Sequence, residues 1–201
     1  MREPFSKFVK TELASETLMI TSGLPGTWKT ETSEEVSRIK RYPILRSDLI
    51  RLEVLKNEDV FDTKVAGNMK KRLSVYDEMF SRAEEMLRRD RKGLILDATF
   101  VTQDLRRRAA AIAAKHKMRL AILETKCSQK VSIARIRRRT KEKYESNALT
   151  VEAYLDNKSK FEPVSTADLK RTNPELQIVH FTVDTEHDSP ESWYVVSLEK
   201  T

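Results

Sequence analysis

A short segment that follows an apolar run has the residue types of a phosphate-binding loop. The apolar run covers residues 17–22, and the segment after it consists of Gly23, Leu24, Pro25, Gly26, Thr27, Trp28, Lys29 and Thr30. In the pattern GxxxxGK[ST], backbone N–H groups surround the β-phosphate of a nucleotide, the lysine bridges the β- and γ-phosphates, and the hydroxyl binds Mg²⁺. Lys29 and Thr30 match these roles. The residue before the lysine should be glycine, but here it is Trp28.

Trp28 alters this loop without removing its reactive groups. Glycine lets the backbone approach the phosphates because it has no Cβ. Tryptophan keeps the amide N–H but adds an indole, which must point away from a nucleotide or lie across the mouth of the site. The indole could stack on a ring of a ligand or pack against a neighbouring helix. Because Lys29, Thr30, Asp48 and Asp97 are all present, we expect altered geometry rather than loss of the site.

Two aspartates also follow apolar runs. Asp48 is the third residue after the strand-like pair 44–45, with Arg51 one helical turn further on. Asp97 ends the apolar run 93–97 and has the position of a carboxylate that binds magnesium directly or through water. Taken alone, either aspartate could equally cap a helix or a turn. If both lie at the same sheet edge as the loop, they favour phosphoryl-transfer chemistry.

Apolar runs of strand length alternate with segments of helical period, which determines how these residues are positioned. Predicted strands cover 17–22, 44–45, 93–97, 119–124 and 176–181, and predicted helices cover 49–56, 63–90, 103–116, 128–140 and 150–161, with others from Lys29 to before Pro43 and from Ser189 onward. The apolar stripe of the 63–90 helix consists of Val65, Met69, Leu73, Tyr76, Phe80, Ala83 and Leu87. This alternation predicts an α/β fold with a five-stranded parallel sheet sandwiched by helices. Ligands of such sheets bind beyond the carboxyl ends of the strands.

Composition and length define the class of protein. The 201 residues suit an N-terminal amphipathic helix within 1–16 and a single domain over 17–201. No apolar stretch approaches the about 18 residues that a membrane span needs, and the start lacks a signal-peptide core, so we expect a cytoplasmic protein with no membrane partner. The single Cys127 cannot form an internal disulfide. The net charge of +7 favours phosphate-bearing partners.

In combination, these elements resemble the P-loop kinase group that includes polynucleotide 5′-hydroxyl kinases, zeta-toxin-like kinases and AAA_33-type kinases. The resemblance runs from about residue 17 to about residue 184. It rests on the loop, on Arg46-Ser47-Asp48-Leu49-Ile50-Arg51, on Leu96-Asp97-Ala98-Thr99-Phe100 and on the region of Arg106 and Arg107. It implies a P-loop nucleoside triphosphate hydrolase fold with a small helical lid over about 128–160. It also implies that Asp48 is the general base for the acceptor hydroxyl and that Arg51 grips the acceptor phosphate. The lid arginines that would close over the phosphates are Arg135, Arg138 and Arg139.

The expected function is therefore a kinase that uses ATP, or alternatively GTP, together with Mg²⁺. The acceptor would be a hydroxyl of an RNA or DNA end, a nucleotide or another small phosphate-bearing molecule. The alternative is a nucleotide-binding regulatory or RNA-binding module whose loop is impaired by Trp28. We expect the second predicted strand to lie beside the first, with Asp48 across the loop from Lys29 and kept ionised by Arg51 or Arg46. The sequence leaves the oligomeric state open.

Overall fold

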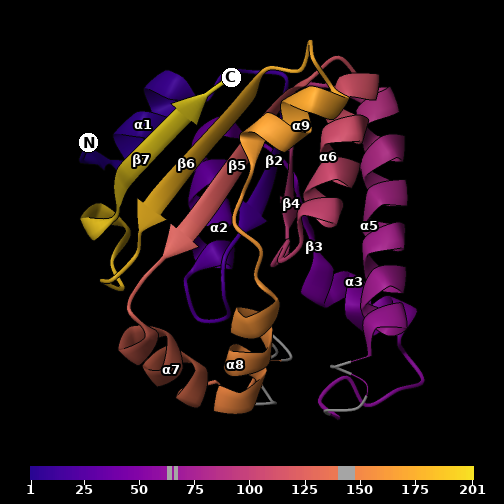
Figure 1. Cartoon of the computed structure of the whole chain (residues 1–201), viewed down its shortest axis with the longest axis vertical. Helices are drawn as coiled ribbons and strands as arrows, with labels where there is room; N and C mark the ends of the chain where they lie inside the picture. Colours follow the sequence, from indigo (N-terminus) through magenta and orange to yellow (C-terminus); the bar gives the residue numbers. More distant parts are fainter. Residues whose placement is uncertain (63–64, 66–67, 140–147) are drawn as a thin grey trace.

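A seven-stranded mixed sheet forms the centre of the computed structural model, which describes residues 1–62, 65, 68–139 and 148–201. The strands are β1 (Glu3–Pro4), β2 (Thr17–Ser22), β3 (Ile44–Arg46), β4 (Gly93–Asp97), β5 (Arg119–Lys126), β6 (Ile178–Asp184) and β7 (Tyr194–Lys200). Their order is β1-β7-β6-β5-β2-β4-β3 (Figure 1). Strands β2 to β6 are parallel to one another, whereas β7 and β1 continue the sheet in antiparallel fashion. The predicted α/β fold and its five parallel strands are confirmed, and the antiparallel edge is an addition.

The C-terminal segment differs from the sequence prediction. We expected a helix from Ser189, but the structure has one 3₁₀ turn, η1 (Pro190–Ser192), followed by strand β7. Residues 193–196 are aromatic and β-branched, types that favour strands. Trp193 is buried, with 1% of its surface exposed, and it packs in the core beside Phe5 of the N-terminal helix. Burial of this indole and pairing with β6 therefore override the helix-start signal of Ser189 and Pro190.

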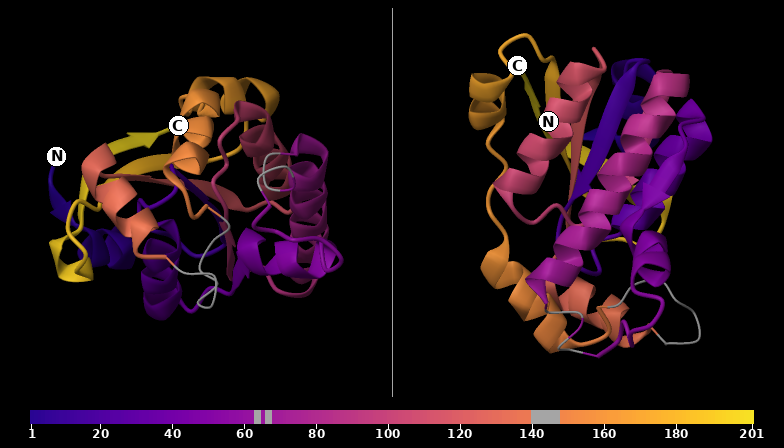
Figure 2. Two further views of the ribbon diagram at one scale, coloured as in Figure 1. Left: turned by 90° about the horizontal axis from the view of Figure 1, so that it is seen from below. Right: turned by 90° about the vertical axis from the view of Figure 1, so that its right-hand side faces the viewer.

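Helices cover both faces of the sheet (Figures 1 and 2). The helices are α1 (Phe5–Glu12), α2 (Lys29–Lys40), α3 (Ser47–Val54), α5 (Met69–Arg89), α6 (Gln103–Lys115), α7 (Gln129–Arg137), α8 (Val151–Lys160) and α9 (Thr166–Thr172). One core cluster joins α3, α5, α6 and α9 to the sheet, and another joins α1 and α2 to its opposite face. Leu18 and Ile20 belong to the first cluster and Met19 to the second, because neighbouring strand residues point to opposite faces.

The strand order corrects one expectation. Strand β3 does not lie beside β2; β4 separates the two, with Leu94 paired to Leu18 and Leu96 paired to Leu45. The short apolar pair at 44–45 could not reveal this order, because adjacency in a sheet depends on crossover connections rather than on local sequence. The register places Arg46 opposite Asp97 at the carboxyl end of the sheet.

The predicted lid corresponds to α7 and α8, which pack against each other beyond the carboxyl ends of the strands (Figure 1). Residues 140–147 of the predicted lid, and residues 63–64 and 66–67 of the predicted long helix, lie outside the described residues. In α5 the predicted stripe is partly wrong: Met69 and Leu73 are 45% and 37% exposed, while Arg72 and Val75 are buried.

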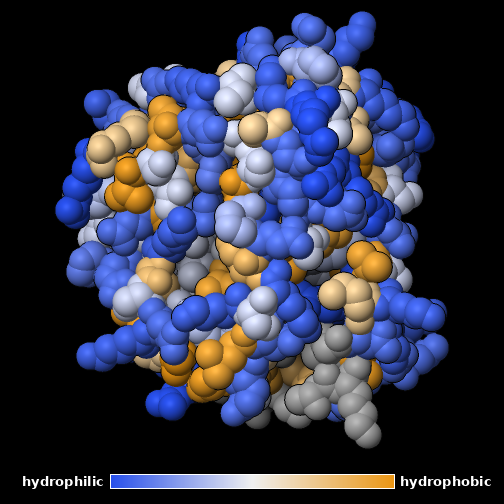
Figure 3. Space-filling model, viewed as in Figure 1, coloured by the Kyte–Doolittle hydropathy of each residue, from blue (hydrophilic) through white to orange (hydrophobic). Residues whose placement is uncertain are grey.

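Hydrophilic side chains cover most of the face in Figure 3, as the 34% charged content predicts. Among the described helices, none combines the length and the apolar character needed to cross a membrane.

Candidate active site

The loop between β2 and α2 is pressed closely against β5 and α7. Gly23 and Gly26 have φ angles of 146° and 80°, in the region that favours glycine. A Cβ on Gly26 would lie 2.5 Å from the backbone oxygen of Ser132 in α7, and one on Gly23 would lie 2.8 Å from the backbone oxygen of Thr125 in β5. Both glycines are therefore required by the backbone packing around the loop.

Trp28 occupies the position before the lysine in a left-handed conformation, with φ 59° and ψ 38°. It precedes the first residue of α2 and makes no side-chain cap, so the N–H groups of the first helical turn have no intrahelical partner and can bind an anion. The indole Nε1 donates to Asp188 at 3.2 Å, and the Arg135 guanidinium lies 4.6 Å from the ring centroid. Of the alternatives left open by the sequence, the structure favours packing against a neighbouring helix, α7.

Thr30 and Asp97 form an oxygen-rich pair at the carboxyl ends of the strands. The Thr30 hydroxyl donates to Asp97 Oδ2 at 2.6 Å, and the Thr21 hydroxyl donates to Asp97 Oδ1 at 3.2 Å. Asp97 is only 5% exposed. Hydroxyl and carboxylate oxygens are hard ligands that suit Mg²⁺. The donor set of Thr30 and Asp97 therefore fits the metal that the loop pattern implies.

A cavity of about 620 Å³ opens beside these residues. The sequence-predicted residues that line it are Pro25, Gly26, Trp28, Lys29, Thr30, Asp48, Arg51, Asp97 and Arg139. Gly23, Leu24 and Thr27 belong to the supporting side of the loop; the Thr27 hydroxyl, for example, lies 2.7 Å from that of Thr125. Although β4 separates β3 from β2, Asp48 and Lys29 face the same cavity because β3 and α2 end and begin at the same sheet edge.

The cavity disfavours charge on several of its ionisable groups. Burial lowers the pKa of Lys29 to about 8, with Asp97 opposing this shift and Arg139 adding to it. Burial likewise raises the pKa of Glu31. Lys29 Nζ donates to the Leu24 carbonyl oxygen at 2.8 Å, so its ammonium lies against its own loop. An anion bound near Lys29 and a cation bound near the carboxylates would relieve these costs.

Opposing effects act on the carboxyl of Asp48, which we expected a neighbouring arginine to keep ionised. Burial, and then the charge of Asp97, raise the pKa of Asp48, while Arg51, Lys29 and Arg46 oppose this shift without cancelling it. Arg51 and Arg46 therefore act in the direction expected from the sequence, but burial and Asp97, whose effects the sequence does not show, outweigh them. A raised pKa suits a group that accepts a proton.

Arg51 lies on α3 beside Asp48 and is 8% exposed. Within the described part of the chain, no hydrogen-bond acceptor meets its Nε or its Nη1. A buried guanidinium with open donors is costly unless a ligand satisfies it. Its geometry is therefore that of a binding group for an anion.

The three lid arginines have different environments. Arg139 lines the cavity. Arg135 is almost fully buried on the far side of the loop, where its Nη1 donates to the Gly26 carbonyl oxygen at 3.2 Å. Arg138 is exposed and pairs with Asp188 at 3.4 Å. Neither Arg135 nor Arg138 lines the cavity, so their contact with phosphates stays a prediction.

Sequence reasoning missed several cavity residues on α8 and on α5. They include Arg72, Tyr76, Glu152, Asn157 and Lys160. Arg72 is 8% exposed, and its Nη2 donates to Asn157 Oδ1 at 3.1 Å, which joins α5 to α8. One signal was available: Arg72 lies three and four residues before Val75 and Tyr76, so a charge stands on the buried face of α5.

Solved structures share this fold at low sequence identity. A gluconokinase from Sinorhizobium meliloti 1021 aligns with a TM-score of 0.58 and 14% identity over 87% of this chain and 85% of its own. A sugar kinase from Janibacter sp. HTCC2649 aligns with a TM-score of 0.57 and 15% identity over 87% of both chains. Kti12 from Chaetomium thermophilum, in complex with ADP-AlF3, aligns with a TM-score of 0.51 and 15% identity over 75% of this chain and 82% of its own.

The family assignment comes from the sequence. No curated protein sequence matches the chain significantly. The AAA_33 family, described as an AAA domain, matches residues 18–164, which include the loop, both aspartates, the helices α7 and α8, and nearly all of the strands β2 to β5. The chain therefore belongs to the AAA_33 family, and it has the fold of the P-loop kinases.

Proposed function

We propose that the protein is an ATP-dependent kinase that requires Mg²⁺ and transfers the γ-phosphate to a hydroxyl of a phosphate-bearing acceptor. The observation that carries the proposal is the shared cavity of Lys29, Thr30, Asp97, Asp48 and Arg51. The first three residues suit a nucleoside triphosphate, and the last two suit an acceptor. Family membership and the kinase fold support the same reading.

The nucleotide half of the site is built by the loop and β4. The open N–H groups at the start of α2 would bind the phosphates, and the Lys29 ammonium would turn from the Leu24 carbonyl oxygen toward them. Thr30 and Asp97 would hold Mg²⁺, which neutralises part of the phosphate charge when bound. Arg139, as the lid arginine on the cavity, would add a guanidinium beside the transferred group.

The acceptor half of the site is built by α3. Asp48 would accept the proton of the acceptor hydroxyl as that oxygen forms a bond to the γ-phosphorus. The bond between the γ-phosphorus and the oxygen that bridges to the β-phosphate breaks, and ADP leaves. The open Nε and Nη1 of Arg51 would bind a phosphate elsewhere on the acceptor. Arg72, buried beside the same cavity, would add positive charge.

A transfer assay over a panel of acceptors tests this function. Radiolabelled γ-phosphate is followed from ATP or GTP, with and without Mg²⁺, to RNA and DNA 5′-hydroxyl ends, nucleotides, gluconate and other sugars. We expect Mg²⁺-dependent transfer to a phosphate-bearing member and its loss in Lys29→Ala. Gluconate belongs in the panel because one structural relative is a gluconokinase. Transfer only to acceptors without phosphate would disprove the acceptor class.

The competing function is nucleotide binding without turnover in a regulatory or RNA-binding module. Nucleotide titration without any transfer, and with Asp48→Ala making no difference, would favour this alternative. Full transfer activity in Lys29→Ala would remove the loop from the mechanism.

A further inference from the structure

The backbone of Trp28 has a conformation that disfavours its own side chain. Its φ of 59° lies in the left-handed region, where a Cβ meets the backbone and where glycine is the usual residue. Trp28 is also the residue directly before the lysine, the position at which the loop pattern expects glycine. The surrounding structure must therefore supply what holds an indole-bearing residue in this conformation.

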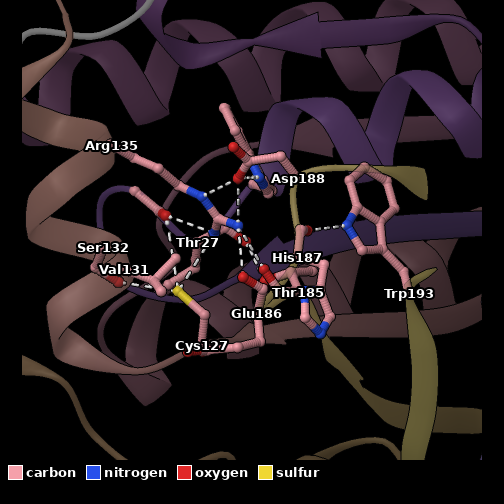
Figure 4. Close-up of polar contacts among 12 residues, drawn as sticks. Thr27, Cys127, Val131, Ser132, Arg135, Thr185, Glu186, His187, Asp188 and Trp193 are labelled. Atoms are coloured by element: carbon pink, nitrogen blue, oxygen red, sulfur yellow. Dashed lines mark hydrogen bonds and ion pairs between the residues drawn. The ribbon is translucent and has the colours of Figure 1, made fainter. Parts of the chain in front are cut away.

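Contacts of the indole supply part of that restraint. Its Nε1 donates to Asp188 Oδ1 at 3.2 Å, and the guanidinium of Arg135 lies over its ring. Arg135 Nε donates to the same carboxylate oxygen at 2.9 Å. One carboxylate thus joins the indole to the guanidinium that stacks on it, and we call these three side chains the Trp28 clamp. Figure 4 shows Arg135 and Asp188 pointing toward each other from α7 and from the segment after β6.

Arg135 also ties the clamp to the rest of the loop. Its guanidinium donates to the backbone oxygen of Gly26 at 3.2 Å. It also donates to the backbone oxygen of Thr185 at 2.7 Å (Figure 4). The Thr185 hydroxyl in turn donates to the Thr27 backbone oxygen at 3.0 Å. Residues 26–28 are therefore held from the side that faces α7 and Thr185, while Gly26 and Trp28 also line the cavity.

We propose that Arg135 and Asp188 are positioning residues that hold Trp28 in its left-handed conformation. The phosphate-binding loop thereby keeps the backbone conformation that glycine adopts at this position in the usual pattern. Neither side chain needs to touch the nucleotide. The proposal rests on the proposed nucleotide site, because its consequence is the affinity of that site. It predicts that nucleotide affinity depends on Asp188 only while residue 28 carries a side chain that must be restrained.

A double-mutant cycle tests this dependence. Affinity for a fluorescent ADP analogue with Mg²⁺ is measured for wild type, Asp188→Ala, Trp28→Gly and the double variant. We expect Asp188→Ala to weaken binding about tenfold in wild type and less than about twofold in the Trp28→Gly background. Trp28→Gly should bind more tightly than Trp28→Ala, because glycine adopts the left-handed region freely. Trp28→Ala should weaken binding about tenfold, because it keeps the Cβ and lacks the clamp.

Matched controls separate positioning from general damage. Glu191→Ala removes a carboxylate from the same exposed segment, where its oxygen contacts Ser189 rather than the clamp, and should leave binding unchanged. Thermal unfolding of each variant without nucleotide checks the fold. The sequence has two tryptophans, so two indole N–H signals are expected by NMR, and Asp188→Ala should shift the one that Trp28→Gly removes.

The outcomes distinguish the two proposals. If wild type binds no nucleotide, the proposed function and the clamp are both wrong. If wild type binds but Asp188→Ala has no effect, or has the same effect in both backgrounds, only the clamp is wrong. An equal loss of nucleotide affinity in Trp28→Gly and Trp28→Ala would also overturn the clamp, because glycine would then be no better than alanine at position 28.

Discussion

Two buried arginines of this protein, Arg51 on α3 at the cavity and Arg106 on α6, differ in how their guanidinium groups are hydrogen-bonded. Arg106 is fully buried, and its two terminal nitrogens donate to the backbone oxygens of Glu162 and Pro163 at 2.8 and 3.1 Å. Arg51 is 8% exposed and leaves its Nε and Nη1 without acceptors among the described residues. The two arginines are therefore buried to a similar degree, but most donors of the Arg106 guanidinium have acceptors, whereas those of Arg51 at Nε and Nη1 do not. The difference favours a bracing role for Arg106 and supports the anion-binding role that we propose for Arg51.

Two aspartates show the same contrast. Asp168 on α9 accepts hydrogen bonds from Arg107 at 2.7 Å, Arg171 at 2.7 Å and Gln103 at 3.1 Å, which hold the pKa of its carboxyl well below the usual range. Asp48 has its pKa raised by burial and by Asp97. Neighbouring arginines lower the pKa of both carboxyls, but at Asp48 burial and the charge of Asp97 outweigh them. The same substitution made at Arg51 and at Arg106, or at Asp48 and at Asp168, can test whether the first residue of each pair acts in the site and the second in the fold.

The largest expected effect is on phosphoryl transfer in Asp48→Asn. The amide cannot accept the acceptor proton, so the transfer rate should fall about 10²- to 10⁴-fold while nucleotide affinity stays within about threefold. Initial rates with the acceptor identified by the panel measure the first quantity, and titration with an ADP analogue measures the second. The matched variant Asp168→Asn should keep the transfer rate within about twofold. A comparable loss in both variants would break the contrast between the two aspartates.

The next largest effect is on stability in Arg106→Met. The substitution leaves the backbone oxygens of Glu162 and Pro163 without their donor, so the free energy of unfolding should fall by about 3 kcal/mol. Urea denaturation followed by circular dichroism gives this value. An unchanged midpoint of unfolding would show that Arg106 is not the brace that its contacts suggest.

Arg51→Met makes the same chemical change as Arg106→Met, but it should impair acceptor binding and leave stability nearly unchanged. Few hydrogen bonds are lost and a buried charge is removed, so the free energy of unfolding should stay within about 0.5 kcal/mol of wild type or rise. The apparent KM for the phosphate-bearing acceptor should increase about tenfold, because an anion loses a charge-assisted partner. Acceptor kinetics and urea denaturation on the same preparation provide both readouts. Destabilisation as large as that of Arg106→Met, with normal acceptor kinetics, would reverse the assignment.

The smallest effect is a pH dependence of stability at Asp168. Because its folded pKa lies below the unfolded value near 3.9, the stabilisation is fully present above that value and is lost as the pH falls through the folded pKa. Asp168→Asn should therefore melt a few degrees below wild type at pH 7. The difference should shrink as the pH drops below about 4. Melting curves of both proteins from pH 7 to pH 3 check this sign, and a gap that widens toward low pH would contradict it.

Much of the site was predictable because its signals are local. The loop from Gly23 to Thr30, with Asp48 and Asp97 after apolar runs, could be recognised from residue types and spacing alone. Arg72 was missed although it stands on the buried face of α5, because a charge on an apolar stripe is easily read as a solvated position. The C-terminal strand was missed because proline and serine at 189–190 gave a helix signal that pairing with β6 overrides.

The sequence by itself determined the alternating strands and helices, the loop with a phosphate-binding pattern, and the carboxylates and arginines that we propose for the site. Periodicity and motif spacing are local properties of the chain, so they can be read without the structure. Only the tertiary structure decided that β4 separates β3 from β2, that Arg135 turns to the far side of the loop, and that burial raises the pKa of Asp48. These outcomes depend on contacts between residues far apart in sequence and on how much water each group loses. Neither quantity is encoded in a short pattern of residues.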